Sequence, residues 1–271
     1  MPDCDIAVVG GGISGLVCAI ELAEKGLSVG LVSKEKELLE ANTKYAQGGI
    51  IGRGSEDSPE LLAKDILEAG AYLNRTKVVN ELSIRGPEYV KDFLIKKIAV
   101  PFQKAEDGSY DYTKEAAHST RRILHVKDKT GFSIQNGLYN YAAKLTSITF
   151  FPGHSAIDII TNTHHSTDTQ ARYHRPQSFG AYVLNQESGK VERFFAAVTI
   201  LATGGIGNLF LHSSNTAGST GDGIAMAYRA GIPIINAEYV QFHPTILYHR
   251  DIKRFLISEA LRGEGARLKN S

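Results

Sequence analysis

An apolar segment near the start of the chain, Ile6–Val9, ends at a cluster of glycines. The segment is too short and too rich in β-branched residues for a helix, so it predicts a buried strand. Ile13–Lys25 follows with apolar residues at helical spacing and stops at Gly26, which is typical of a helix C-terminus. A second apolar run, Ser28–Val32, completes the order strand, turn, helix, strand. This order predicts the opening unit of a parallel α/β fold.

The turn between the first strand and the helix has the spacing Gly10-x-Gly12-x-x-Gly15. In this context the first glycine permits a tight turn, the second lets the backbone approach a pyrophosphate, and the third lets the helix pack on the sheet. The free N–H groups and the dipole of the helix would then stabilise the phosphates. The spacing predicts a dinucleotide site without distinguishing FAD from NAD. A glycine-rich turn in an ordinary α/β protein is the alternative.

The second strand ends differently from the usual dinucleotide site. The fingerprint places an acidic residue there to bind the ribose, whereas this chain has Ser33 and Lys34, with Glu35 one position later. The sequence therefore assigns no residue to the ribose contact. Lys34 either contacts the adenosine half of the ligand or is solvated.

The rest of the chain predicts helices first and short strands afterwards. Ser58 can cap a helix that has Pro59 in its first position. Helices are expected at Pro59–Ala69, Lys77–Ile84, Pro87–Lys97, Thr130–Leu145 and Ile224–Arg229. Short strands are expected at Ile148–Phe151, Ala156–Ile160, Ala181–Leu184, Val191–Phe195 and, buried, at Val198–Ala202. The turn Glu187–Lys190 joins two of these strands into a β-hairpin.

A polar loop at His164–Ser178 contains three histidines. A metal site is one interpretation of this loop. No set of carboxylate or cysteine ligands accompanies the histidines, so a flexible loop tip is expected instead, and no metal.

Composition narrows the class of protein. The 271 residues are enough for one large domain or two ordinary ones, and the net charge of +1 favours neither a nucleic-acid partner nor a membrane surface. Two cysteines, Cys4 and Cys18, fit no metal motif and indicate a reducing compartment. No apolar run approaches the ~18 residues of a membrane span, and no basic segment followed by an apolar one opens the chain. These features predict a cytoplasmic protein.

Four further segments share their order and spacing with one family of enzymes. They are NTKYAQGGI at 42–50, HSTRRILH at 118–125, ATGG at 202–205 with GDGIAMA at 221–227, and QFHPT at 241–245 with EALRGEGA at 259–266. With the glycine turn they resemble the flavoproteins of the succinate dehydrogenase/fumarate reductase family. The resemblance runs along essentially the whole chain.

The resemblance implies FAD as the bound dinucleotide. The pyrophosphate would be held by Gly10, Gly11, Gly12, Ile13, Ser14 and Gly15. The ribityl chain and flavin ring would lie along the backbone amides of Asn42, Thr43, Lys44, Tyr45, Ala46, Gln47, Gly48 and Gly49. The adenosine half and the rest of the cofactor would be contacted by Lys34, by the backbone of Ala156, by Gly204 and Gly205, and by Asp222 as a hydrogen-bond acceptor.

Three residues point to one branch of this family. Asn42 stands where the dehydrogenases carry a histidine that often bonds FAD covalently, and Tyr45 stands where they usually have alanine. Both features resemble the aspartate-oxidising branch, in which FAD is bound noncovalently. Glu115 matches a glutamate of that branch thought to favour a substrate amino group, since a carboxylate stabilises a protonated amine through a charge-assisted hydrogen bond. From residue type alone, Glu115 would be a solvated loop carboxylate.

The resemblance also implies a substrate pocket. A dicarboxylate needs cationic or hydrogen-bonding groups at both ends, and its Cα must be held near the flavin for hydride transfer. The residues expected there with Glu115 are His243, Ser258, Glu259 and Arg262. From residue types alone, His243 would equally be a loop histidine before Pro244. Glu259 and Arg262 would equally be an ordinary pair of opposite charges three residues apart on a helix.

We therefore expect an α/β protein with a Rossmann-like FAD-binding domain, an added β-hairpin region and the beginning of a small α+β capping domain. Residues 1–238 would form the N-terminal part of the FAD-binding domain, without its return segment, and residues 239–271 would begin the capping domain. Family members continue well beyond this point, with a catalytic arginine in the further segment.

The expected activity is oxidation of L-aspartate to iminoaspartate, with oxygen or fumarate as the electron acceptor. This would be the first step of quinolinate and NAD biosynthesis, with a functional link to quinolinate synthase. One alternative is a soluble flavoprotein of the fumarate reductase or succinate dehydrogenase type. The other is an inactive, truncated flavin-binding remnant.

Overall fold

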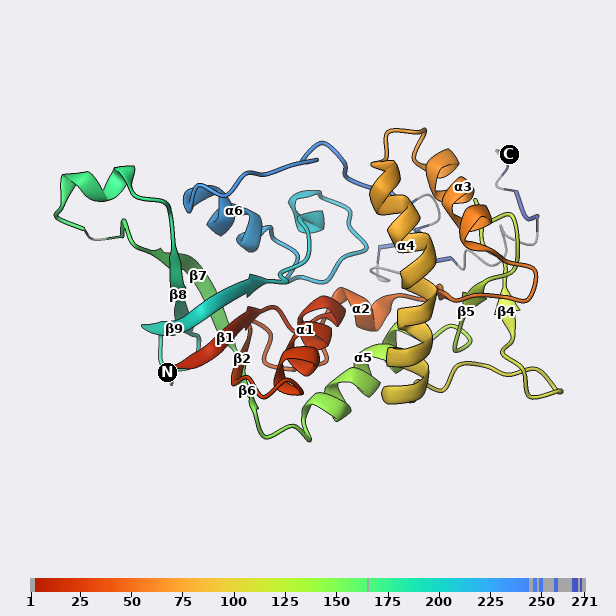
Figure 1. The fold of residues 1–271 in the computed structure, drawn as a ribbon, viewed down its shortest axis with the longest axis horizontal. Coiled ribbons are helices and arrows are strands. Elements are labelled where there is room, and N and C mark those ends of the chain that lie inside the picture. The colour runs from red at the N-terminus through yellow and green to blue at the C-terminus, as the bar shows by residue number, and fades with distance from the viewer. Residues whose placement is uncertain are drawn as a thin grey trace. The chain divides into compact units, whose positions relative to one another are not determined.

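The computed structural model describes residues 3–164, 166–243, 246–247, 249–250, 256–257, 265–267 and 269 (Figure 1). The chain divides into two compact units. One comprises Met1–Thr43 with Leu138–Pro244, and the other comprises Lys44–Gly137 with Thr245–Ser271. The boundary expected after residue 238 stays a prediction.

The first unit is built on a six-stranded sheet with the order β6-β2-β1-β9-β8-β7. Four strands, from β6 to β9 in this order, run parallel, and β8 runs antiparallel to both of its neighbours. The parallel part confirms the Rossmann-like α/β class. The strands are β1 (Cys4–Val9), β2 (Val29–Ser33), β6 (Ile148–Pro152), β7 (His154–Thr161), β8 (Ser178–Asn185) and β9 (Lys190–Leu201).

Two of the described α-helices lie wholly within this unit. The predicted first helix is confirmed as α1 (Ile13–Ala23), and α6 (Asp222–Arg229) begins just after Gly221. The helix α5 (Thr130–Ala142) contains the boundary between the two units. Two of the described 3-10 helices lie in loops of this unit. The first, η2 (Thr169–Tyr173), lies between β7 and β8, and the second, η3 (Gly207–Leu209), lies between β9 and α6.

The strand β9 corrects two predictions. We expected one strand at Val191–Phe195 and a separate buried one at Val198–Ala202, but Lys190–Leu201 is continuous. Its first half pairs antiparallel with β8, and its second half pairs parallel with β1. No glycine or proline interrupts the segment, so one strand passes from the hairpin into the parallel sheet. Val198 is 48% exposed, contrary to the expected burial.

The two faces of β1 are both covered, as a central parallel strand requires. Residues 6–9 are all buried, and Ala7 belongs to a core cluster with the fully buried ring of Phe194. A Cβ on Gly30 of β2 would overlap that ring, so the absence of a side chain there makes room for it. Leu16 and Ile20 of α1 are also buried. This packing sets the position of α1 against the sheet.

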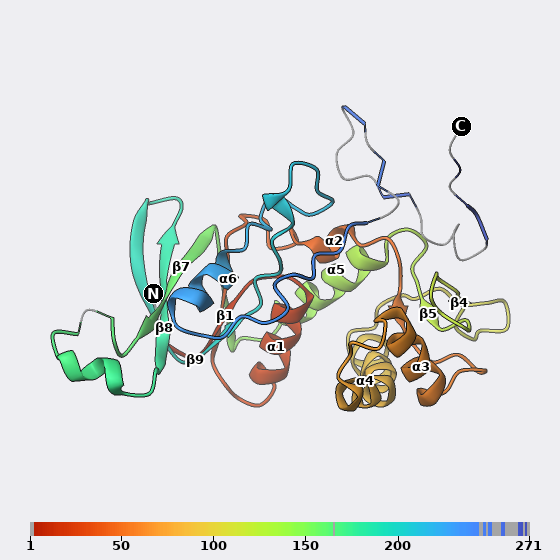
Figure 2. The ribbon, with the colours of Figure 1, turned by 90° about the horizontal axis from the view of Figure 1, so that it is seen from above.

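The second unit contains two long helices and a small antiparallel sheet, β3-β5-β4 (Figure 2). The capped helix is confirmed as α3 (Pro59–Ala69), with Ser58 Oγ accepting from the Leu61 N–H at 3.2 Å. The short helix α2 (Asn42–Tyr45) crosses the boundary between the two units. The other elements are α4 (Thr76–Tyr89), the π-helix η1 (Val90–Lys97), β3 (Ile50–Ile51), β4 (Tyr112–Thr113) and β5 (Ile123–Leu124).

Pro87 does not end a helix, contrary to the separate helices expected at Lys77–Ile84 and Pro87–Lys97. It lies inside α4, which continues directly into η1. A proline lacks the N–H that would bond the carbonyl four residues earlier, here that of Ser83. The Arg53 guanidinium donates to this Ser83 carbonyl at 2.5 Å. A side chain distant in sequence therefore satisfies the carbonyl that the proline leaves free.

A buried arginine joins two carboxylates in the second unit. Arg122 is fully buried and forms ion pairs with Asp57 at 2.9 Å and Asp65 at 2.6 Å. The Asp65 carboxylate also accepts from the N–H and the hydroxyl of Ser119, both at 2.9 Å. Burial acts to raise the pKa of Asp65, but the bonds from Ser119 and Arg122 outweigh it and lower this pKa. The carboxylates of Asp57 and Asp65 thus both pair with one buried cation.

Candidate dinucleotide site

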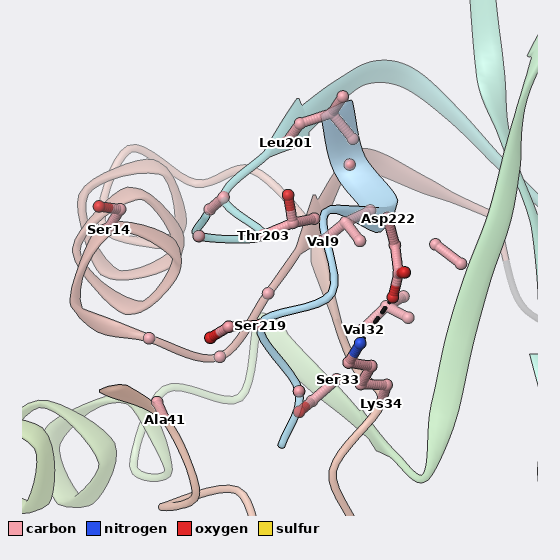
Figure 3. A pocket seen from close by; sticks show the side chains of 18 of the residues that line it. Val9, Ser14, Val32, Ser33, Lys34, Ala41, Leu201, Thr203, Ser219 and Asp222 are labelled. Atoms are coloured by element: carbon pink, nitrogen blue, oxygen red, sulfur yellow. Dashed lines mark hydrogen bonds and ion pairs between the residues drawn. The ribbon is translucent and has the colours of Figure 1, made fainter. Parts of the chain in front are cut away.

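A cavity of about 590 Å³ lies where β1, β2 and β9 end (Figure 3). All of the residues that line it belong to the first unit. They include the glycine turn after β1, Ser33 and Lys34 at the end of β2, and Thr203 after β9. The carboxyl edge of a parallel sheet is where such folds bind their ligands.

The glycine turn can be formed only by glycine at two of its positions. Gly10 has φ of 118°, and a Cβ there would overlap the carbonyl oxygen of Ala202. A Cβ on Gly15 would overlap the carbonyl oxygen of Gly10, so α1 could not approach the turn. Gly12 is different, because the nearest atom to its Cβ would be Thr43 Oγ1 at 3.7 Å. The turn therefore presents backbone, without side chains, to the cavity.

The N-terminus of α1 faces the same cavity. Gly12 is its N-cap and has no side chain to bond the first N–H groups. The Thr43 hydroxyl supplies one partner from a distant segment by accepting from the Ile13 N–H at 3.1 Å. The first N–H groups of a helix have no partners within the helix and favour an anion. Gly10, Gly11, Gly12, Ile13 and Ser14 all line the cavity, as a pyrophosphate site requires.

Lys34 has partners at the far side of the cavity. Its ammonium donates to Asp222 Oδ2 at 2.6 Å and to Thr220 Oγ1 at 2.8 Å, and Figure 3 shows it reaching from β2 to the start of α6. The Thr220 hydroxyl donates to the other Asp222 oxygen at 2.8 Å. Lys34 lines the cavity, and its contact with the adenosine half of the ligand stays a prediction.

The Lys34–Asp222 pair gives a pH prediction. Burial acts to raise the pKa of Asp222, but the hydrogen bonds from Lys34 and Thr220 and the charge of Lys34 outweigh it, so the pKa lies below its ordinary value of 3.8. A carboxyl with a lowered pKa stabilises the fold above its ordinary pKa, and this contribution is lost as the pH falls through the lowered value. Both side chains are partly exposed, so the pair contributes about 1 kcal/mol or less.

We expect Asp222→Asn to lower the free energy of unfolding by a constant amount above about pH 5. The difference from the unsubstituted chain should shrink as the pH falls below 3.8. Urea unfolding at a series of pH values checks this. A difference that grows on acidification would contradict it.

The 42–49 segment is divided between the two units. Asn42 and Thr43 line the cavity, whereas Lys44, Tyr45, Ala46, Gln47, Gly48 and Gly49 fall in the second unit. There the Gly49 N–H donates to Glu115 Oε1 at 3.1 Å. A Cβ on Gly48 would come within 3.0 Å of the same oxygen. The structure thus brings the expected specificity residue Glu115 against the two glycines of the AQGG run.

The remaining predicted residues are placed unevenly. Ala156, Gly204 and Asp222 line the cavity, while Gly15 and Gly205 are not among its lining residues. His243 is half-buried, belongs to the first unit and does not line the cavity. Ser258, Glu259 and Arg262 lie outside the described residues. Their roles stay predictions.

Sequence reasoning missed part of the cavity wall. Thr203, Thr216, Ser219 and Met226 also line it. A signal was present, because residues 213–220 form a run of small, mostly polar residues between two of the family-like segments.

Among the described residues, no group of three or more His, Cys, Asp or Glu could hold a metal ion. Within the same part of the chain, no helix is long and apolar enough to cross a membrane.

Comparisons with known proteins agree with this site. A family model described as an FAD binding domain matches residues 5–271. The L-aspartate oxidase of Vibrio cholerae is 40% identical over 98% of this chain and 49% of its own length. Those of Pseudomonas aeruginosa and Halobacterium salinarum are each 41% identical over 98% of this chain, covering 49% and 50% of their own lengths. The chain thus spans about half the length of the curated relatives it matches.

Solved structures show the same fold. A Mycobacterium smegmatis Sdh1 complex in the apo form has a TM-score of 0.85 and 31% identity, covering 99% of this chain and 46% of its own. A mutant FrdA of Escherichia coli quinol fumarate reductase has a TM-score of 0.85 and 27% identity, covering 97% of this chain and 43% of its own. With the family model, these matches identify the dinucleotide as FAD. The bare glycine turn, the helix N-terminus and the Lys34–Asp222 pair fit such a ligand.

Proposed function

Because this chain belongs to the family of FAD binding domains, we propose that it forms the cofactor-binding part of a flavin-dependent oxidase of L-aspartate. The observation that carries the proposal is the cavity at the ends of β1, β2 and β9, in a chain about 40% identical to L-aspartate oxidases over nearly its whole length. The product would be iminoaspartate, with oxygen or fumarate as the acceptor.

The residues of the first unit would divide the cofactor between them. The bare backbone of the glycine turn and the N-terminus of α1 would bind the pyrophosphate. Lys34 and Asp222 would offer a donor and an acceptor to the adenosine half, and the backbone of Ala156 would contact the adenine. All of these contacts are noncovalent. FAD, when bound, supplies the acceptor for the hydride that leaves the substrate Cα.

The substrate would be bound by side chains of both charges. His243 and Arg262 would bind the carboxylates, with a hydroxyl from Ser258, and Glu259 would orient the cationic groups. Glu115 would stabilise the substrate ammonium. The imine product hydrolyses in water, so an enzyme such as quinolinate synthase that consumes it is the natural functional partner, and the cytoplasm is the expected location.

The test uses the full-length protein, because this chain spans about half the length of its relatives and the resemblance places the catalytic arginine in a further segment. FAD is titrated and followed by quenching of its fluorescence, and the loaded protein is then mixed anaerobically with L-aspartate or with succinate. The proposal expects saturable FAD binding and loss of the oxidised flavin spectrum with L-aspartate only. Bleaching by succinate would support the fumarate reductase or succinate dehydrogenase type instead. Absence of FAD binding would overturn the proposal.

Glu115→Gln is expected to reduce the preference for L-aspartate over succinate by about ten- to hundredfold, because a hydrogen bond to a charged group contributes about 1.5–3 kcal/mol. The glutamine carbonyl can still accept from the Gly49 N–H, so the local structure should be retained. The measurement is the ratio of flavin reduction rates with the two substrates. The control is Glu187→Gln in the exposed hairpin turn. Equal losses with both substrates would contradict the role of Glu115.

A further inference from the structure

A segment without regular secondary structure forms one wall of the cavity. We call residues 213–220, which follow η3 and precede α6, the strap. Thr216, Gly218 and Ser219 of the strap line the cavity. Thr216 and Ser219 are only 5% and 4% exposed although both are polar. A buried polar segment must obtain its hydrogen bonds from specific partners.

The side chain of Asn42 supplies three of these hydrogen bonds. Its Oδ1 accepts from the Thr216 N–H at 2.7 Å. Its Nδ2 donates to Asn215 Oδ1 and to Ser219 Oγ, both at 2.9 Å. A side-chain amide has two N–H donors and one carbonyl oxygen, so every polar group of Asn42 bonds to the strap. The two partners are more than 170 residues apart in sequence.

A second asparagine holds the strap from another element. The Asn208 N–H of η3 donates to the Ser219 carbonyl at 3.0 Å, and its side-chain amide donates to the Thr216 carbonyl. The Asn215 side chain packs so closely on Gly207 that a Cβ there would come within 2.5–2.9 Å of it. The strap is therefore held through polar contacts on two sides, and Asn42 makes those that connect it to α2.

We propose that Asn42 is a positioning residue, whose side chain pins the strap to α2 so that Thr216 and Ser219 form a wall of the FAD cavity. This inference rests on the proposed function only for the identity of the ligand. It gives the side chain of Asn42 a role within the protein, whereas the family resemblance implied a backbone contact with the cofactor at a position where the dehydrogenases carry a histidine that often bonds FAD. Without these bonds the strap would lose its link to α2, and the cavity would lose a fixed wall.

The experiment compares Asn42→Ala with two further variants. Asn42→Asp keeps the acceptor for the Thr216 N–H and loses both donors. Asn162→Ala is the matched control, because Asn162 closes a loop away from the cavity by bonding Arg175 and Gln177, each at 3.2 Å. Amide hydrogen exchange is measured without FAD, and the dissociation constant for FAD is measured by fluorescence quenching.

For Asn42→Ala we expect exchange over residues 215–219 to be about tenfold faster or more, and FAD binding to be about tenfold weaker. Asn42→Asp should retain slow exchange at the Thr216 amide and lose protection elsewhere in the strap. This pattern would separate lost hydrogen bonds from a general loss of stability. Asn162→Ala should change neither measurement at the cavity.

Unchanged exchange over residues 215–219 in Asn42→Ala would overturn the inference, whether or not FAD binds. Faster exchange with unchanged FAD affinity would overturn the positioning role. If the unsubstituted chain binds no FAD, the proposed function fails by itself, and the exchange measurement alone decides whether Asn42 pins the strap.

Discussion

Gly10→Ala is expected to destabilise the first unit by about 2–6 kcal/mol and to abolish FAD binding. Two costs add at this position. The backbone has φ of 118°, which a residue with a Cβ rarely adopts, and the new methyl group would overlap the Ala202 carbonyl that follows β9. Relieving the overlap would separate the ends of β1 and β9, which line the cavity. Urea unfolding and FAD titration of the variant measure the two effects.

Gly26→Ala is the matched control for this substitution. Gly26 also has a positive φ, of 84°, but a Cβ there would have no atom within 4 Å. The control therefore isolates the backbone cost, about 1–2 kcal/mol, and should leave FAD binding intact. Equal effects of the two substitutions would show that the contact with Ala202 is unimportant.

Arg122→Met is expected to lower the free energy of unfolding by about 3–5 kcal/mol. The substitution fills a similar space but leaves the carboxylate of Asp65 buried without its cation, and leaves Asp57 with only its longer pair to Arg53 at 3.5 Å. An uncompensated buried charge costs far more than the ion pair itself contributes. The measurement is urea unfolding at neutral pH.

Arg85→Met provides the comparison for Arg122. Arg85 pairs with Glu81 at 2.8 Å, but its side chain is 75% exposed, so the loss should be about 0–1 kcal/mol. The triple substitution Arg122→Met, Asp57→Leu, Asp65→Leu removes the charges together and should recover part of the lost stability. A loss below about 1 kcal/mol for Arg122→Met would contradict the importance of the buried pairs.

Local features of the chain predicted much of the fold. The strand–turn–helix–strand order at residues 6–32 and the capped helix after Ser58 depend on neighbours within a few residues. Helix caps, apolar periodicity and glycine turns act over this range, so they can be read directly from a sequence. The same local pattern predicted a dinucleotide site at the glycine turn, where the structure has a cavity.

Two predictions failed where distant residues decided the outcome. Pro87 should end a helix by local rules, but Arg53 takes the Ser83 carbonyl that the proline leaves free. The segment Lys190–Leu201 reads as two strands, but two different partners, β8 and β1, hold it as one. Arg53 and β1 lie far away in sequence from the segments they bond, and a local pattern carries no information about such partners.

The sequence by itself determined the βαβ unit, the glycine turn and the family to which the chain belongs, because steric limits on the backbone and residue spacing are properties of short segments. Only the tertiary structure decided the partners of Lys34, Asn42 and Arg122. Each bonds to groups from other elements, up to 188 residues away. The physical reason is that a hydrogen bond or ion pair depends on distances of about 3 Å between atoms, which exist only after the chain has folded.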